Sequence, residues 1–339
     1  MAIKLLIVDD SAFMRKIIRD IVKEFHGIEV VGIARNGMDA LKKIELLKPD
    51  IITLDIEMPI LNGLDTLKII KEKYDIPVIM LSSRTGTDIT IEALQIGALD
   101  FIEKPKDLTD LENLSIELEN KLKSIVKKEA KKYDIKYDRE LTKQGIEPSR
   151  EFDAVVIAAS TGGPKALVYL ISQLPKDIQV PIFIVQHMPK GFTTSFAHRL
   201  DSESQVRVVE AEEGMEIEAG NVYLAPGDYH MVIDKNQISL NQLEKLHGVR
   251  PAADYLFESA SKIYKDRLLG IILTGMGRDG SQGMATIKKN GGYNIVQSER
   301  SCVVYGMPGS AVELGVVDAI LDLEDISLSL NKVVRSRPN

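Results

Sequence analysis

Cysteine and histidine are scarce in this sequence. Cys302 is the only cysteine among 339 residues, so no internal disulfide can form. The five histidines are scattered and show no paired spacing of the kind that metal ligands have. We therefore expect no structural zinc site.

The sequence also lacks a long uncharged apolar run and an excess of positive charge. No segment approaches the roughly 20 apolar residues of a membrane helix, and the first residues, MAIKLLIVDD, reach two aspartates too early for a secretion signal. We expect no membrane insertion and a cytoplasmic location. A net charge of -7 disfavours nucleic acid as a partner, and no helix-turn-helix pattern follows the first predicted domain.

The rhythm of apolar and amphipathic segments divides the chain into two α/β regions, as its length suggests. Residues 1–122 alternate in a way that predicts a five-stranded parallel sheet with helices on both faces. Residues 123–150 are rich in charge and read as the end of a helix and a linker. Residues 151–339 alternate again, with a hairpin predicted at Lys235 and Asn236, so we expect a doubly wound α/β domain with some antiparallel strands.

Polar residues stand where four predicted strands of the first region end. Asp9 and Asp10 follow the first strand, Asp55 ends the third, Ser82 follows the fourth and Lys104 the fifth. The carboxyl ends of parallel strands meet in one crevice, so these groups are expected to share a site. Clustered carboxylates suit Mg²⁺, with Asp55 as a phosphoryl acceptor and Ser82 and Lys104 holding the phosphoryl oxygens. Taken singly, each residue is equally typical of a turn or helix cap.

The motifs VDDS, LDIEMP and EKP complete this pattern, and residues 1 to about 120 resemble a response-regulator receiver domain with a flavodoxin-like fold. The resemblance implies that Asp55 is phosphorylated. It implies that Asp9, Asp10, Asp55 and the backbone carbonyl of Glu57 hold Mg²⁺. Phe101 occupies the aromatic switch position of the family, although a core role explains it equally well.

A strand, a turn of small residues and a helix are predicted over AVVIAASTGGPKALVYL, with Ser160 in the turn. Gly162 and Gly163 leave a hydroxyl approachable beside helix-terminal amides, so Ser160 is a candidate nucleophile. A helix N-cap explains the same serine, and the glycine-rich turn is also compatible with phosphate binding. The spacing alone does not decide between these readings.

A nucleophilic serine needs a base and a group that orients the base. His187 ends the strand IFIVQ, and Asp279 lies in the glycine-rich TGMGRDG after the strand LLGIILT, so both can reach the same sheet edge as Ser160. Three other histidines compete for the role of base: His198 on a predicted helix, His247 in a polar stretch and, most seriously, His230 at the start of a hairpin strand.

From about residue 152 the sequence resembles the catalytic domain of the CheB family, the protein-glutamate methylesterases of chemotaxis. The resemblance rests on ASTGGP, QHMP, APGDYHM, TGMGRDG and SCVVYGMP. It implies that Ser160 is the nucleophile, His187 the base and Asp279 its orienting acid. It further implies an oxyanion contact from the backbone amide of Met276 and a positioning role for Thr161.

One segment departs from the family pattern, because Ala252 stands where a serine is expected. A hydroxyl at this place would help to line a substrate groove, so the role of the segment is open. The neighbouring Arg250 is a candidate for contact with receptor carboxylates, although a structural role is an equally ordinary one for an arginine.

Together the two resemblances imply a phosphorylation-regulated serine hydrolase. Its substrates would be glutamate methyl esters, and in some members glutamine side chains, of methyl-accepting chemotaxis receptors. Its phosphodonor would be a chemotaxis histidine kinase, with Mg²⁺ in the receiver and no cofactor for ester hydrolysis. Two other classes stay open from the residues: a catalytically silent scaffold and a phosphorylation-controlled DNA regulator. The intact serine, histidine and aspartate disfavour the first, and the acidic charge disfavours the second.

Overall fold

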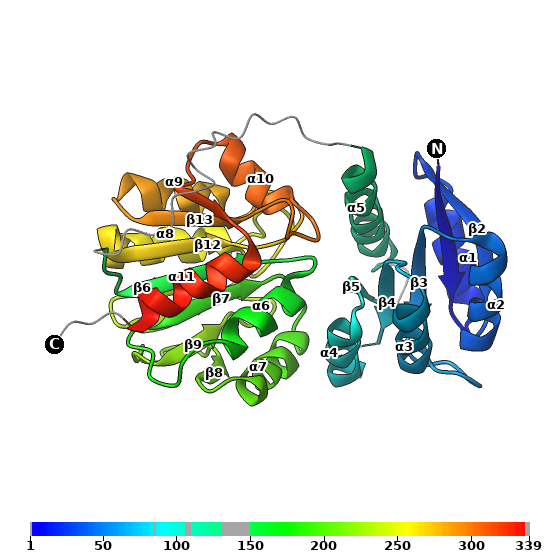
Figure 1. Cartoon of the computed structure of the whole chain (residues 1–339), viewed down its shortest axis with the longest axis horizontal. Helices are drawn as coiled ribbons and strands as arrows, with labels where there is room; N and C mark the ends of the chain where they lie inside the picture. The colour runs from blue at the N-terminus through cyan, green and yellow to red at the C-terminus, as the bar shows by residue number, and fades with distance from the viewer. Residues whose placement is uncertain (1, 84–85, 106–109, 131–149, 336–339) are drawn as a thin grey trace. The chain divides into compact units, whose positions relative to one another are not determined.

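A computed structural model describes residues 2–83, 86–105, 110–130 and 150–335, with the backbone alone over 124–130. The chain separates into two compact units, Met1–Lys132 and Tyr133–Asn339 (Figure 1). The predicted linker lies largely outside the described residues, so the boundaries proposed for it stay a prediction. No helix of the described residues is long and apolar enough to span a membrane.

The first unit has one sheet of five parallel strands in the order β2-β1-β3-β4-β5. Its strands carry apolar side chains on both faces because helices cover both, as in other doubly wound sheets. Helices α1 and α5 pack on one face around Ile18 and Leu118. The elements are β1 (Ile3–Val8), α1 (Ala12–Val22), β2 (Ile28–Ala34), α2 (Gly37–Leu47), β3 (Ile51–Asp55), α3 (Gly63–Lys73), β4 (Val78–Ser82), α4 (Thr87–Ile96), β5 (Asp100–Glu103) and α5 (Leu111–Ala130).

The second unit has a seven-stranded sheet in the order β14-β13-β12-β6-β7-β9-β8, in which every pair is parallel. Its elements are β6 (Ala154–Ala159), α6 (Gly163–Ser172), β7 (Ile182–Gln186), α7 (Phe192–Glu203), β8 (Arg207–Glu210), β9 (Asn221–Leu224), β10 (His230–Asp234), β11 (Gln237–Asn241), α8 (Ala253–Tyr264), the 3-10 helix η3 (Lys265–Arg267), β12 (Leu268–Ile272), α9 (Ser281–Lys289), β13 (Tyr293–Gln297), α10 (Gly306–Glu313), β14 (Ala319–Leu321) and α11 (Leu323–Arg335).

Helices cover both faces of this sheet as well (Figure 1). Alternate residues of β6 pack against Leu256 and Phe257 of α8, while the residues between them, such as Ile157, are equally buried beneath other elements. Helix α6 packs on β6, and α11 packs on β13 and β14. The doubly wound fold expected from the sequence is thereby confirmed.

The antiparallel strands expected in this unit form a separate hairpin. Strands β10 and β11 pair with each other outside the main sheet, and Lys235 takes a left-handed backbone conformation (φ 54°) between them, as a two-residue hairpin turn requires. The short strands β9 and β14, by contrast, were not anticipated.

Candidate functional site

The central strands of the larger sheet bring three predicted site residues to one edge. Strand β6 lies between β12 and β7, and the chain leaves β6 in one direction toward β7 and later returns on its other side at β12. Ligands of open parallel sheets bind at such a reversal, outside the carboxyl ends of the strands. Ser160 follows β6, His187 follows β7, and Asp279 lies in the loop after β12.

Ser160 sits in a tight turn that backbone hydrogen bonds define. Its amide donates to the carbonyl of Thr274 at 3.0 Å, and its own carbonyl accepts the amide of Gly163 at 2.7 Å. The N-cap of α6 is Gly162, with a left-handed φ of 77° and no capping side chain, so Ser160 is not the helix cap. Among the described residues its half-buried hydroxyl has no hydrogen-bond partner, which leaves it available for chemistry.

His187 and Asp279 are joined by a hydrogen bond of 2.7 Å between Nε2 and Oδ2. The carboxylate is 2% exposed and accepts three backbone amides, from Ala253 (2.6 Å), Asp254 (3.1 Å) and Gly280 (3.0 Å). Burial opposes its ionisation, but the hydrogen bond and charge of His187 and these amides hold the pKa of Asp279 below its usual value. Asp279 is therefore a fixed anion beside the imidazole.

The loop before Asp279 passes close to the serine. A side chain at Gly275 would come within 2.9 Å of the Ser160 Cβ atom, so only a glycine allows this approach. The next residue, Met276, is half-buried, and its backbone amide has no partner among the described residues. Thr161 is 2% exposed, and its carbonyl accepts the Thr274 hydroxyl at 2.9 Å.

The predicted acidic pocket of the first unit is also assembled. The Lys104 ammonium lies 2.7 Å from Oδ1 of Asp55 and 3.0 Å from Oδ2 of Asp9. Burial raises the pKa of Asp55 to about 6; Lys104 opposes the rise and the nearby Asp9 charge adds to it. Despite burial, the two carboxylates raise the pKa of Lys104. A small pocket at this place is lined by Asp55, Ile56, Glu57, Ser82, Ser83, Gly86 and Lys104.

The donors of this pocket fit a hard divalent cation. Carboxylate oxygens of Asp9, Asp10 and Asp55 lie within 4.8 Å of one another. Oδ2 of Asp55 is buried without a hydrogen-bond partner among the described residues, an arrangement that a cation would relieve. Within the same residues the carbonyl of Glu57 accepts no hydrogen bond.

Two other residues singled out in the receiver-like sequence, Ser82 at the pocket and Phe101 at the predicted switch position, have partners outside the carboxylate cluster. The Ser82 hydroxyl lies 2.5 Å from that of Thr90 on α4 and can donate to the Ser83 carbonyl at 3.0 Å. The Phe101 ring is buried, with the Lys121 ammonium 5.5 Å from its centre. Phe101 therefore occupies a core position.

Comparisons with known proteins match both units. The family model "CheB methylesterase" matches residues 155–330, and the model "Response regulator receiver domain" matches residues 5–115. The chain belongs to the CheB methylesterase family. A relative from Pyrococcus horikoshii, named protein-glutamate methylesterase/protein-glutamine glutaminase, is 46% identical over 98% of this chain and 94% of its own length.

Other CheB relatives agree with this assignment. A protein of the same name from Clostridium acetobutylicum is also 46% identical, over 98% of each chain. The crystal structure of the Thermotoga maritima CheB methylesterase catalytic domain is 44% identical, with a TM-score of 0.52; it matches 54% of this chain and all of its own. We call the two units the receiver and the hydrolase below.

The rival histidines of this CheB chain have other partners. His198 is exposed on α7. His230 is fully buried, with Nδ1 accepting the Ala252 amide at 3.1 Å and Nε2 facing the Glu244 carbonyl at 3.2 Å, so both ring nitrogens are engaged. Burial lowers the pKa of His230, which favours the neutral ring that this pair of bonds requires.

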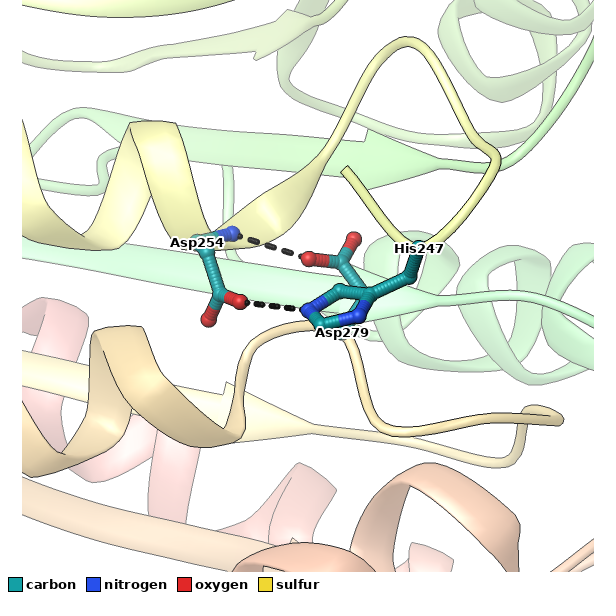
Figure 2. Close-up of side chains that lie close together, drawn as sticks. All are labelled: His247, Asp254 and Asp279. Carbon is teal, nitrogen blue, oxygen red and sulfur yellow. Dashed lines mark hydrogen bonds and ion pairs between the residues drawn. The ribbon is translucent and has the colours of Figure 1, made fainter. Parts of the chain in front are cut away.

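His247 belongs to a cluster with Asp254 and Asp279, whose donor atoms lie within 4.8 Å of one another (Figure 2). Its Nε2 lies 3.1 Å from Oδ2 of Asp254. Every carboxylate oxygen of this cluster already faces an N–H group. Oδ1 of Asp254 accepts the Gly283 amide, and both oxygens of Asp279 accept backbone amides of α8. The cluster is therefore a hydrogen-bonded network, and we assign no metal to it.

Arg250 has a structural role in this chain. Its guanidinium bonds Oδ1 of Asp228 at 2.6 Å and donates to the carbonyls of Gln242 (3.1 Å) and Leu243 (3.0 Å). These bonds hold together the loop between β11 and α8. Its side chain is only 18% exposed, so contact with receptor carboxylates is not the role that the structure supports.

Ala252, the departure from the family pattern, is the N-cap of α8 and offers no capping side chain. A serine here would accept one of the first amides of the helix. In this chain the Asp279 carboxylate accepts the amides of Ala253 and Asp254 instead. The Asp279 carboxylate thus accepts the helix amides that a hydroxyl at position 252 would otherwise cap.

Two residues beside the candidate triad escaped the sequence analysis. The Gln186 carboxamide donates to the carbonyls of Ser160 (3.1 Å) and His187 (3.3 Å), and it packs where Gly163 has no side chain. The Thr274 hydroxyl donates to the Thr161 carbonyl and accepts the Val304 amide at 3.0 Å. Their only sequence signal is that Gln186 opens the motif QHMP and Thr274 opens the motif TGMGRDG.

Proposed function

We propose that this protein is a phosphorylation-regulated esterase that hydrolyses glutamate methyl esters on methyl-accepting chemotaxis receptors. The observation that carries the proposal is the 2.7 Å hydrogen bond from the His187 ring to the buried Asp279 at the sheet edge that also bears Ser160. The names of the CheB relatives supply the substrate class.

In the proposed reaction the Ser160 hydroxyl attacks the ester carbonyl. Because Asp279 engages Nε2 of His187, Nδ1 is the ring nitrogen left to take the serine proton. The imidazolium then gives this proton to the departing methoxide, and methanol leaves. Water, deprotonated by the same ring, hydrolyses the acyl-enzyme and releases the receptor carboxylate and Ser160.

Charge develops on the carbonyl oxygen during attack, and the unpartnered amide of Met276 is the proposed donor to it. Thr161 is proposed to help place His187, since it lies buried between Ser160 and Thr274. A glutamine side chain can follow the same route with ammonia as the leaving group, so we extend the proposal to receptor glutamines.

In the receiver, we propose that Asp55 accepts a phosphoryl group from a chemotaxis histidine kinase in the cytoplasm. Asp9, Asp10, Asp55 and the Glu57 carbonyl would hold Mg²⁺, which neutralises the phosphoryl oxygens. Lys104 would keep contact with the phosphorylated side chain, and the Ser82 hydroxyl would turn from Thr90 to the phosphoryl group. Modification is proposed to raise the hydrolase rate.

The test is methanol release from methylated receptor membranes by the full chain, with Mg²⁺ and with acetyl phosphate added or withheld. We expect acetyl phosphate to accelerate release, and Ser160→Ala to abolish release in both conditions. Equal rates with and without acetyl phosphate would overturn the regulation, and release by Ser160→Ala would overturn the nucleophile. A covalent serine probe that labels the wild type but not Ser160→Ala separates an enzyme from a silent scaffold.

A further inference from the structure

A second buried carboxylate stands directly behind the acid of the candidate triad. Asp254, in the first turn of α8, is 3% exposed. Its backbone amide donates to Oδ1 of Asp279 at 3.1 Å, and carboxylate oxygens of the two residues lie within 4.8 Å of each other. The reaction proposed above leaves this group without a role.

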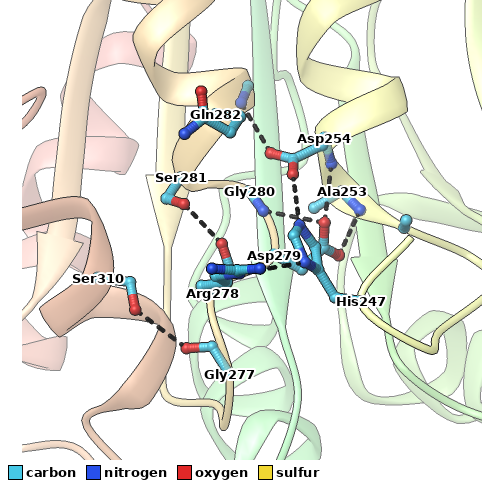
Figure 3. A network of polar contacts seen from close by, with 12 residues as sticks. His247, Ala253, Asp254, Gly277, Arg278, Asp279, Gly280, Ser281, Gln282 and Ser310 are labelled. Carbon is cyan, nitrogen blue, oxygen red and sulfur yellow. Dashed lines mark hydrogen bonds and ion pairs between the residues drawn. The ribbon is translucent and has the colours of Figure 1, made fainter. Parts of the chain in front are cut away.

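The Asp254 carboxylate is held by two other segments (Figure 3). Oδ1 accepts the amide of Gly283 on α9 at 2.7 Å, and Oδ2 faces Nε2 of His247 at 3.1 Å. The Arg278 guanidinium, which stays protonated, donates from Nε toward Nδ1 of His247 at 3.4 Å. With Nδ1 accepting, Nε2 carries the proton and donates to Asp254, and this hydrogen bond stabilises the charged form of the carboxylate against its burial.

The electrostatic surroundings of Asp254 are defined on every side. Burial and the charge of Asp279 raise the pKa of Asp254, while Gly283 and His247 counteract the rise. His187 faces Asp279 from the end of β7, and the buried His230 lies within electrostatic range of both Asp279 and Arg250. Arg278 is the cation on the outer side of His247. Two adjacent carboxylates, Asp279 and Asp254, therefore belong to one network that reaches the His187 ring through Asp279.

We propose that Asp254 is a positioning residue for ester hydrolysis, acting through Asp279 on His187. The proposal rests on the function proposed above. During each acyl-transfer step the His187 ring becomes positive, and the second negative charge beside Asp279 stabilises that positive ring, because charges in a buried site are weakly screened. The His247–Arg278 pair keeps this charge in place.

The test is the pH profile of methanol release by the full chain from methylated receptor membranes, at fixed acetyl phosphate and Mg²⁺. Asp254→Asn keeps an acceptor for the Gly283 amide and removes the charge. We expect kcat to fall about tenfold with KM unchanged, and the acid limb of kcat to move to lower pH by about one unit, since the ring is then easier to deprotonate.

A matched control is Asp318→Asn. Asp318 also bonds a backbone amide, that of Asn294 at 2.8 Å, and lies near Lys288, but it belongs to the segment before β14. This variant changes the net charge by the same amount as Asp254→Asn, and both variants leave the receiver sequence unaltered. Its profile should coincide with that of the wild type.

A lower melting temperature of Asp254→Asn with an unmoved pH profile would overturn the proposal, because the residue would then be structural only. If Asp254→Asn does not fold, His247→Leu provides the second variant, since His247 is partly exposed and its loss leaves the Asp254 carboxylate. Without its donor this carboxylate binds a proton at higher pH, so kcat should fall chiefly at the acidic end. An unchanged profile of His247→Leu also overturns the proposal. A wild type that releases no methanol overturns the parent function instead.

Discussion

The hydrolase and the receiver each place buried carboxylates at the carboxyl ends of parallel strands, but the two sets differ in how their oxygens are satisfied. Asp279 accepts three backbone amides and the His187 ring. Among the described residues, Asp55 has one cation, a single backbone amide (that of Glu57, at 3.4 Å), a like-charged neighbour and an oxygen without a hydrogen-bond partner. The first arrangement keeps an anion in one place through a reaction cycle, whereas the second is relieved by binding a cation or a phosphoryl group.

The largest effect is expected from a substitution at Asp279. In Asp279→Asn, one oxygen is replaced by an NH₂ group, which must face backbone N–H donors whichever way the amide turns. The ring of His187 also loses the anion that orients it. We expect kcat for methanol release to fall about 10³–10⁴-fold. A loss below tenfold, measured on a variant with a normal melting temperature, would contradict the assigned role.

Asp55→Asn tests the opposite claim for the receiver. An aspartate with a pKa of 3.8 when unfolded and about 6 when folded contributes stability below pH 4 that is lost as the pH rises through 6. At pH 7.5 without Mg²⁺, removing this charge should raise the free energy of unfolding by about 2–3 kcal/mol. Lys104 keeps its contact with Asp9.

Chemical denaturation at pH 7.5 and pH 4 measures this difference, which should vanish at the lower pH. The same variant should lose all acceleration by acetyl phosphate. A variant that is less stable than the wild type at pH 7.5 would show that the Asp55 carboxylate is well satisfied after all.

Gln186→Leu tests whether the Gln186 carboxamide positions the candidate site of the hydrolase. The change preserves bulk but removes the carboxamide that donates to the carbonyls of Ser160 and His187. We expect kcat to fall about tenfold, as loss of about 1–2 kcal/mol of positioning would give, with KM unchanged. Steady-state methanol release measures both constants; a change in KM alone would assign Gln186 to substrate binding.

The smallest effect is expected at His230. Its lowered pKa means that the unfolded chain binds a proton more readily, so the stability it contributes is present above pH 6.5 and is lost as the pH falls further. His230→Asn should flatten the decline in hydrolase stability between pH 7 and pH 5, seen by thermal unfolding, and should retain turnover. Complete loss of turnover would return His230 to the list of candidate bases.

Strand-end chemistry could be predicted from the sequence because it depends on local pattern. Asp9, Asp55 and Lys104 each follow a buried run, and neighbouring ends of a parallel sheet must converge. The choice of base could not be made in this way, because His187 and His230 both stand at a strand terminus. Partners far apart in the chain decide it: His187 meets Asp279 across 92 residues.

The supporting residues were missed for a related reason. Gln186 and Thr274 act on backbone carbonyls and amides, which every residue has, so no pairing of side-chain types signals them. Strands β9 and β14 are only four and three residues long, too short for a pattern of alternation. At Ala252 the sequence indicates only that a hydroxyl is missing, whereas the three-dimensional structure shows that the Asp279 carboxylate accepts the two helix amides there.

The four donors around Asp279 come from the end of β7, the start of α8 and the start of α9. These segments are made at different times during synthesis, and Ser160, the proposed nucleophile, is made before all of them. The loop that carries Ser160 is thus made before the donors that hold Asp279, the proposed partner of His187. The proposed base therefore depends on three segments that are far apart in the chain, and it gains its fixed partner only when the first turns of α8 and α9 have formed.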